Sequence, residues 1–307
     1  MRSSRIARSL TALLAYGLTA CAGSSTPAPS AGAPTASAPE ASPSSSIQVS
    51  PSVGPSTTFT PQAGGLIDIG NGRSLWLECS GTGSPTVLLE SGLGGDHRTW
   101  ELVQPRLAES GRVCTYDRAG IGESDPATTP RTAADTVEDL ELLLEAADIE
   151  PPYVLVGFSI GGAIAQLYSA THPEDIAGLV LVESNHPDEV EQFEAHLTPA
   201  QVAEDRAEVM NNPEGFDPFT SLEQLQAAGP QPDVPLVVVT AGISEGWPPG
   251  WDAAMFDALR ADQQADLVTL TSQGTQVIAD NSRHHVPSEQ PGVIVEAVAT
   301  VLRTIAE

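Results

Sequence analysis

The feature that most constrains this chain is the stretch VLVGFSIGGAIAQLYSA, residues 154–170. An apolar run typical of a strand, Val154–Val156, ends at Gly157, and an apolar pattern with helical spacing begins just after Ser159. A sharp turn from strand to helix strains its central residue, and the residues two positions away on either side must be small to avoid collision. Gly157 and Gly161 meet that requirement. The stretch therefore predicts a serine hydroxyl raised above a sheet edge, facing the N–H groups that begin a helix.

Runs typical of strands and helices alternate from about residue 65 onward. The expected strands are 66–69, 75–79, 86–90, 112–116, 154–156, 178–182, 236–240 and 276–278. The expected helices are 100–109, 133–147 and 293–305, and Asn71-Gly72 indicates a hairpin turn between the first two strands. This alternation predicts a mostly parallel sheet with helices on both faces. Between the sixth and seventh strands, acidic helix-prone segments predict a helical insertion at about residues 186–233.

Four motifs, taken together, resemble the α/β-hydrolase fold family from roughly Leu66 to Glu307. The first is the stretch around Ser159. The second is ESGLGG, residues 90–95, where the family commonly has His-Gly-x-Gly and this chain has Ser91 in place of the histidine. The others are YDRAGIGES, residues 116–124, and SRHH, residues 282–285. The resemblance implies an eight-stranded, mostly parallel sheet with helices on both faces and a helical cap.

The resemblance also implies a serine hydrolase. A serine hydroxyl barely ionises at neutral pH, so Ser159 needs a base, and the base needs a carboxylate that orients it. His284 matches the family position of the base better than His285 does. The backbone N–H groups of Leu93 and Ile160 match the positions that bind the oxyanion.

Two glutamates compete for the role of the acid. In much of the family the acid follows the strand that we expect at 236–240, which favours Glu245. In some branches, including dehalogenase-like ones, the acid comes one strand earlier, where Glu183 closes the run LVLVE. We favour Glu183, because a residue at that strand end points toward the site, whereas Glu245 lies in a loop rich in Gly, Pro and Trp. Asp117 is expected to order the loop that contains Arg118.

The remaining histidines and large aromatic side chains have structural alternatives. His97 either contacts substrate or lies at the surface, His172 is expected to be structural, and His186 and His196 are expected to face solvent. The candidates for the walls of the site, with core packing as an equal alternative, are Trp100, Phe158, Trp247 and Trp251. No histidine or cysteine spacing indicates a metal site, and no cofactor is expected.

The N-terminus predicts a bacterial lipoprotein signal. Arginines at positions 2, 5 and 8 precede an apolar stretch, residues 10–18, that is too short to span a membrane. The run LTAC ending at Cys21 resembles a lipobox, in which the cysteine becomes the lipid-bearing N-terminus. The expected organisation is a signal peptide (1–20), a disordered Pro/Ser/Ala-rich tether (21–61) and a hydrolase domain (62–307), anchored outside the cell membrane. The alternative is an ordinary secretory signal.

Composition excludes several classes of function. All thirteen basic residues are arginine, so mechanisms that need a lysine are excluded. The net charge of −27 disfavours nucleic acid as a partner. An exported chain enters an oxidising compartment, where Cys79 and Cys114 invite a disulfide. The resemblance places Cys79 at the end of the second strand, beside the start of the fourth, and so implies that the two cysteines pair.

The expected function is cleavage of a small-molecule carboxylic ester through an acyl-enzyme at Ser159. The alternatives are amide or peptide cleavage, acyl transfer on the same residues, and a non-catalytic surface lipoprotein that only binds. Family members that dehalogenate or open epoxides have aspartate at the nucleophile position, so Ser159 argues against both reactions. The tether is compatible with a monomer.

Overall fold

The computed structural model describes residues 64–307. The expected signal peptide, the expected lipid-bearing Cys21 and the expected tether all lie outside the described residues. Within 64–307, none of the helices combines the length and the apolar character that crossing a membrane requires.

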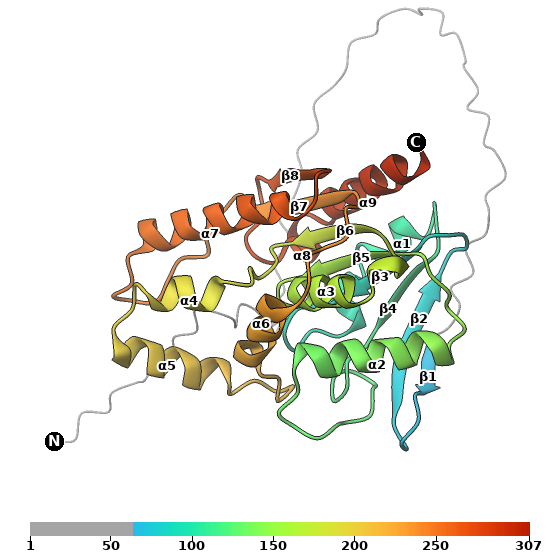
Figure 1. The fold of residues 1–307 in the computed structure, drawn as a ribbon, viewed down its shortest axis with the longest axis horizontal. Coiled ribbons are helices and arrows are strands. Elements are labelled where there is room, and N and C mark those ends of the chain that lie inside the picture. The colour runs from blue at the N-terminus through green and yellow to red at the C-terminus, as the bar shows by residue number, and fades with distance from the viewer. Residues whose placement is uncertain (1–63) are drawn as a thin grey trace, which may run out of the picture. The chain divides into compact units, whose positions relative to one another are not determined.

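Eight strands form one sheet, in the order β1-β2-β4-β3-β5-β6-β7-β8. Only β2 runs antiparallel to its neighbours, and the other pairings are parallel (Figure 1). All eight expected strands are confirmed, and so is the mostly parallel sheet. The strands are β1 (Gly65–Asp68), β2 (Ser74–Ser80), β3 (Thr86–Glu90), β4 (Val113–Tyr116), β5 (Tyr153–Phe158), β6 (Ile176–Val182), β7 (Leu236–Ala241) and β8 (Gly274–Ala279).

Local sequence explains the antiparallel edge of the sheet. Asn71 and Gly72 both have positive φ, 54° and 71°, as the expected hairpin turn requires, and this turn brings β2 back along β1. Cys79 and Cys114 are register partners on β2 and β4 and form the expected disulfide.

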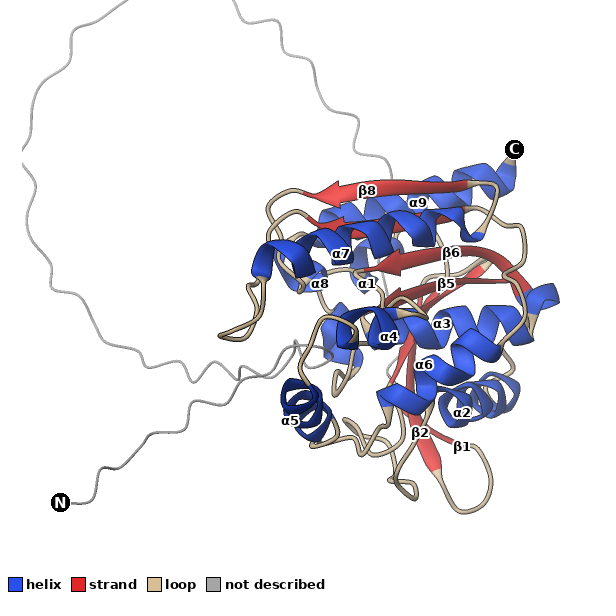
Figure 2. Ribbon diagram, turned by 60° about the vertical axis from the view of Figure 1, so that its left-hand side comes forward, coloured by secondary structure: helices blue, strands red, loops and turns tan. Residues whose placement is uncertain are grey.

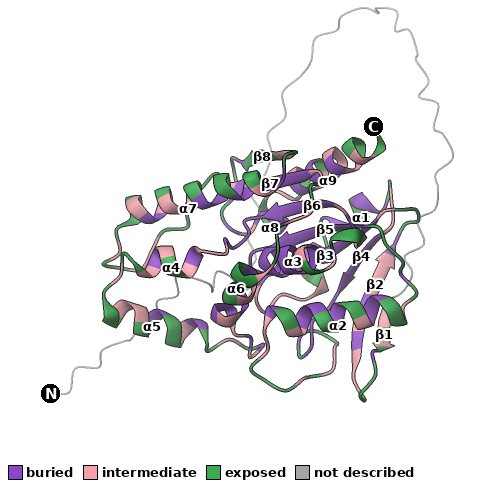
Figure 3. Cartoon of the chain, in the orientation of Figure 1, coloured by how far each residue is buried: buried purple, intermediate pink, exposed green. Residues whose placement is uncertain are grey.

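The strands alternate between two apolar cores, one on each face of the sheet. In β5, Leu155 packs into one core and Val154 and Val156 into the other, and β6 and β7 repeat the pattern. The first core is completed by α2 (Ala133–Ala146), α3 (Ile160–Thr171) and α6 (Pro218–Ala227), and the second by α1 (Gln104–Leu107) and α9 (Pro291–Ala306). Figures 2 and 3 show the helices on either side of the sheet and the buried central strands. Coverage of both faces is thus confirmed.

The insertion between β6 and β7 is helical, as expected. It contains α4 (Glu189–Glu194), α5 (Pro199–Val209) and α6, and Figure 1 shows α4 and α5 beyond the end of the sheet toward which the parallel strands point. Thr198 and Gln201 form a reciprocal capping box that fixes the start of α5.

Three helical segments differ from expectation. The helix expected at 100–109 is instead a 3₁₀ turn, η1 (His97–Trp100), followed by the short α1. Two helices were not expected: α7 (Ala253–Leu267) and α8 (Val286–Glu289). Only four of the fifteen residues of α7 are fully buried, and two of these are glutamines, so its apolar pattern is weak. Short 3₁₀ turns, η2 (Pro173–Asp175) and η3 (Val268–Leu270), complete the fold.

Candidate active site

Ser159 occupies the expected sharp turn between β5 and α3. Its backbone has φ 56° and ψ −126°, a conformation that L-residues rarely adopt. A Cβ atom at Gly157 would lie 2.4 Å from the carbonyl oxygen of Gly161, and one at Gly161 would lie 2.4 Å from the carbonyl oxygen of Ser91. The expected need for small residues on both sides of the serine is therefore confirmed.

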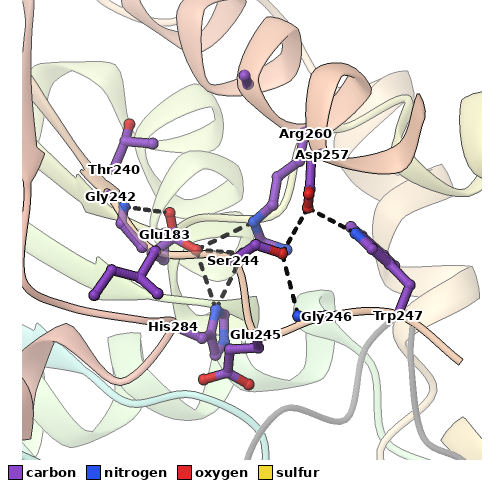
Figure 4. A pocket seen from close by; sticks show the side chains of 13 residues that line it. Glu183, Thr240, Gly242, Ser244, Glu245, Gly246, Trp247, Asp257, Arg260 and His284 are labelled. Carbon is purple, nitrogen blue, oxygen red and sulfur yellow. Dashed lines mark hydrogen bonds and ion pairs between the residues drawn. The ribbon is translucent and has the colours of Figure 1, made fainter. Parts of the chain in front are cut away.

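The structure brings Glu183 and His284 together beside this turn. Glu183 follows β6, and its carboxylate lies 3.3 Å from Nδ1 of His284 (Figure 4). The side chains of both residues are buried, and the other carboxylate oxygen accepts from the backbone N–H of Ala241 at 2.7 Å. The His284 ring lies 5.0 Å from the ring of Phe158, the residue before the serine. Glu245, the competing acid, is exposed in the loop after β7.

The surroundings fix the charges of this pair. Burial opposes ionisation of Glu183, but the charge of Arg260 and the hydrogen bond with His284 outweigh burial and lower the pKa of Glu183 to about 2. Burial lowers the pKa of His284 to about 4, although the hydrogen bond with Glu183 opposes this change. At neutral pH the pair is therefore a carboxylate and a neutral imidazole, which is the state that a general base needs.

Arg260, on α7, belongs to the site, and the sequence analysis assigned it no role. Its Nη2 lies 2.5 Å from the carboxylate of Glu183 and 3.0 Å from Nδ1 of His284. A sequence signal for α7 exists in Asp252, whose side chain caps the helix by accepting from the N–H of Met255. That signal places a helix but not the partners of its arginine.

The Gly-rich loop after β3 lies directly against the nucleophile turn. A Cβ atom at Gly92 would lie 3.3 Å from Cβ of Ser159. The loop carries Leu93, and Ile160 is the first residue of α3, so both expected oxyanion donors border the serine. The N–H of Gly94 donates to the carboxylate of Glu214 at 3.0 Å.

A buried network of charged side chains contacts the Gly-rich loop and holds it in place. Arg118 donates to the carbonyl oxygens of Ser91 and Gly92 at 2.6 and 2.8 Å. Its guanidinium also pairs with Glu90, at 2.6 Å, and with Glu214, at 2.5 Å. Glu214 belongs to the insertion between β6 and β7, so one carboxylate connects the insertion to the Gly-rich loop. The sequence analysis assigned no role to either glutamate.

Asp117 has the structural role that was expected. Its buried carboxylate accepts from the backbone N–H of His97 at 2.7 Å and from that of Glu123 at 2.9 Å, and so it orders the loop that contains Arg118. The His97 ring also bonds to Asp117.

One cavity adjoins the pair of Glu183 and His284, and a second adjoins the Gly-rich loop and Phe158. A cavity of about 300 Å³ is lined by Glu183, His284, Arg260 and Trp247 among others, and one of about 190 Å³ by Phe158, His285 and the loop at 92–95. Trp247 and Phe158 are therefore wall residues. Trp100 is fully buried, so of the two alternatives the core-packing one is correct for this residue. Trp251 stacks on Trp247.

The other histidines divide between structural and exposed positions. His172 stacks on Tyr168, as a structural residue would, and His196 is exposed. The expectation that His186 faces solvent is wrong, because its ring is buried and bonds to Asp266 at 2.9 Å. Among residues 64–307, no group of three or more His, Cys, Asp or Glu side chains is arranged to hold a metal ion.

Comparison with known proteins agrees with the fold described above. Residues 85–233 match the family model described as alpha/beta hydrolase fold. The uncharacterized protein YqjL of Bacillus subtilis is 27% identical over 72% of this chain and 85% of its own length. A putative carbamate hydrolase, RutD of Azorhizobium caulinodans, is 34% identical over 37% of this chain and 42% of its own length. Two other curated relatives match over only 18% and 33% of their length.

Solved structures show the same fold. The alpha/beta hydrolase domain-containing protein 10 from mouse superimposes with a TM-score of 0.61 at 17% identity, over 79% of this chain and 99% of that one.

Proposed function

Because the chain is an enzyme with the α/β-hydrolase fold, we propose that it is a serine hydrolase that cleaves carboxylic esters through an acyl-enzyme at Ser159. The observation that carries the proposal is the strained Ser159 beside the buried pair of Glu183 and His284. The strained turn presents the hydroxyl, and the pair supplies an oriented base of the protonation state that the reaction needs.

The proposed reaction has two steps. Oγ of Ser159 attacks the ester carbonyl carbon while Nε2 of His284 accepts the hydroxyl proton, and the alcohol leaves with that proton. Water then loses a proton to His284 and attacks the acyl-enzyme, and the imidazolium returns that proton to Oγ of Ser159 as the carboxylic acid leaves. Glu183 stabilises the imidazolium in both steps, and the N–H groups of Leu93 and Ile160 bind the oxyanion.

The test is hydrolysis of a series of p-nitrophenyl esters of increasing acyl length. We expect the wild type to turn over at least one ester, and Ser159→Ala to lose the activity. Glu183→Gln should lose far more activity than Glu245→Gln, its matched control on the exposed loop. The assignment of the acid is wrong if Glu245→Gln is the more damaged variant.

A fluorophosphonate probe separates the alternatives. Labelling of the wild type, but not of Ser159→Ala, combined with inertness toward all esters would indicate an amidase, a peptidase or an acyltransferase. A carbamate belongs among the substrates tried, because one relative is named as a putative carbamate hydrolase. A chain that neither labels nor hydrolyses any substrate would be the non-catalytic surface lipoprotein.

We also propose that the enzyme is exported and anchored outside the bacterial cell membrane through lipidated Cys21. The support is the sequence LTAC after a short apolar stretch. Expression of wild type and Cys21→Ala in a bacterial host, followed by fractionation, tests the anchor. We expect the wild type in the membrane fraction and the variant in the soluble exported fraction, and membrane association of both would refute it.

A further inference from the structure

Arg260 shares one carboxylate oxygen with the imidazole of His284. Oε2 of Glu183 lies 2.5 Å from Nη2 and 3.2 Å from Nε of the arginine, but 3.3 Å from Nδ1 of the histidine. The guanidinium therefore has the closer contact with the group that would orient the base. Figure 4 shows the three side chains converging at the wall of the larger cavity.

The position of Arg260 affects the imidazole in two ways, both in the same direction. Nη2 of the positively charged guanidinium lies 3.0 Å from Nδ1, and this charge disfavours protonation of the ring to the imidazolium. It also competes for Glu183, whose negative charge would otherwise favour the imidazolium. Arg260 thus favours the neutral ring even though a carboxylate touches that ring.

Other charged groups around the ring come from several elements. His285 follows His284 directly, with its ring 5.7 Å away. Glu245 approaches from the loop between β7 and α7, and Glu189 on α4 lies near Arg260 and Glu183; burial raises the pKa of Glu189 to about 7, so it is largely protonated in acidic solution. Of the groups around the ring, Arg260 is the cation that contacts both Glu183 and His284.

We propose that Arg260 is a positioning residue that keeps His284 in its neutral, proton-accepting form in acidic solution, by taking part of the Glu183 carboxylate and by placing a cation beside Nδ1. The proposal rests on the proposed function, in which His284 is the base. It implies that the enzyme stays active at a lower pH than an esterase whose carboxylate–histidine pair has no cation beside it.

The first test is the pH dependence of kcat/KM for ester hydrolysis, followed by pH-stat titration from about pH 4 to pH 9. In Arg260→Gln we expect the midpoint of the acidic limb to rise by about one pH unit or more, a tenfold change in proton affinity. Arg260→Lys keeps a cation and should shift the midpoint less. Arg303→Gln, at an exposed arginine on α9, is the matched control and should not shift it. A merely structural role would lower the rate at every pH and leave the midpoint in place, which would overturn the proposal.

The second test does not depend on activity. The imidazole signals of the six histidines are followed by NMR against pH, and His284→Asn identifies the signal of His284. We expect that signal in the wild type to titrate well below the ordinary value of about 6.5, and Arg260→Gln to raise it. An unchanged midpoint in that variant, or an ordinary midpoint in the wild type, overturns the proposal. Failure of the proposed function would appear separately, as absence of fluorophosphonate labelling and ester turnover.

Discussion

Replacement of Glu214 tests whether the insertion holds the Gly-rich loop in place. The carboxylate accepts two hydrogen bonds from Arg118, at 2.5 and 2.9 Å, and one from the N–H of Gly94. Glu214→Ala would leave part of a buried guanidinium and one loop N–H without partners. Breaking a buried ion pair from one side costs about 3–5 kcal/mol. Because Glu90 and two carbonyl oxygens still hold Arg118, we expect a loss near the lower figure, about 3 kcal/mol. Glu214→Gln keeps one acceptor oxygen and should lose about 1–2 kcal/mol.

The measurement is urea unfolding followed by tryptophan fluorescence, together with ester hydrolysis below the unfolding transition. Because Gly94 neighbours a proposed oxyanion donor, kcat should also fall, on the order of tenfold to a hundredfold in Glu214→Ala. Glu204→Ala, at an exposed glutamate on α5, is the matched control and should change neither quantity. The reasoning is refuted if Glu214→Ala unfolds within about 0.5 kcal/mol of the wild type, the range of an ordinary surface substitution.

Three further predictions concern other parts of the fold. Burial raises the pKa of Glu189 from 4.5 to about 7, so the folded state favours the protonated form and the protein loses stability as pH rises from about 4.5 through 7. Glu189→Gln should therefore raise the free energy of unfolding by about 2 kcal/mol at pH 8 and leave it nearly unchanged near pH 4.5. Urea titrations of both proteins at the two pH values measure this difference. Replacing Cys79 and Cys114, 35 residues apart, with alanine should lower that free energy by about 3–4 kcal/mol, measured by chemical unfolding beside the reduced wild type. Gly161→Ala should abolish ester hydrolysis and fluorophosphonate labelling, because its Cβ would collide with the carbonyl oxygen of Ser91; normal labelling would contradict the geometry of the turn.

The sheet could be predicted from sequence because its signals are local. Each central parallel strand is a short buried apolar run between turn residues, and the eight runs expected from the sequence match the eight strands observed. The disulfide was implied by the resemblance to the α/β-hydrolase fold, in which the second strand lies beside the fourth, and the structure confirms it. The turn at Ser159 could be predicted for the same reason, because the two glycines that it requires, at 157 and 161, lie within five residues of sequence.

Contacts between distant elements could not be predicted in this way. Arg260 reaches Glu183 across 77 residues, and Glu214 reaches Arg118 across 96. Each pair depends on how a helix or loop outside the sheet packs against a strand end, which periodicity does not encode. The prediction that His186 faces solvent was wrong for the same reason, because its partner, Asp266, lies 80 residues away in the sequence. An isolated charged residue in an acidic chain has many possible partners, and only the packed structure selects one.

Glu183 shows that strain, as well as position, distinguishes the two candidate acids. Its φ is 47°, a left-handed conformation that costs of order 1–3 kcal/mol for a residue with a side chain. It directly follows β6, as Ser159 directly follows the neighbouring strand β5, and both residues keep a sheet hydrogen bond: the N–H of Ser159 donates to the carbonyl oxygen of Val182, and the N–H of Glu183 donates to that of Val239. Each strand thus stays paired up to the residue that turns away, so the sheet itself supports the strain. A solvated glutamate has no need of such a backbone, whereas one that must meet a histidine above the sheet edge does, and this argues for Glu183 over Glu245 independently of any hydrogen bond.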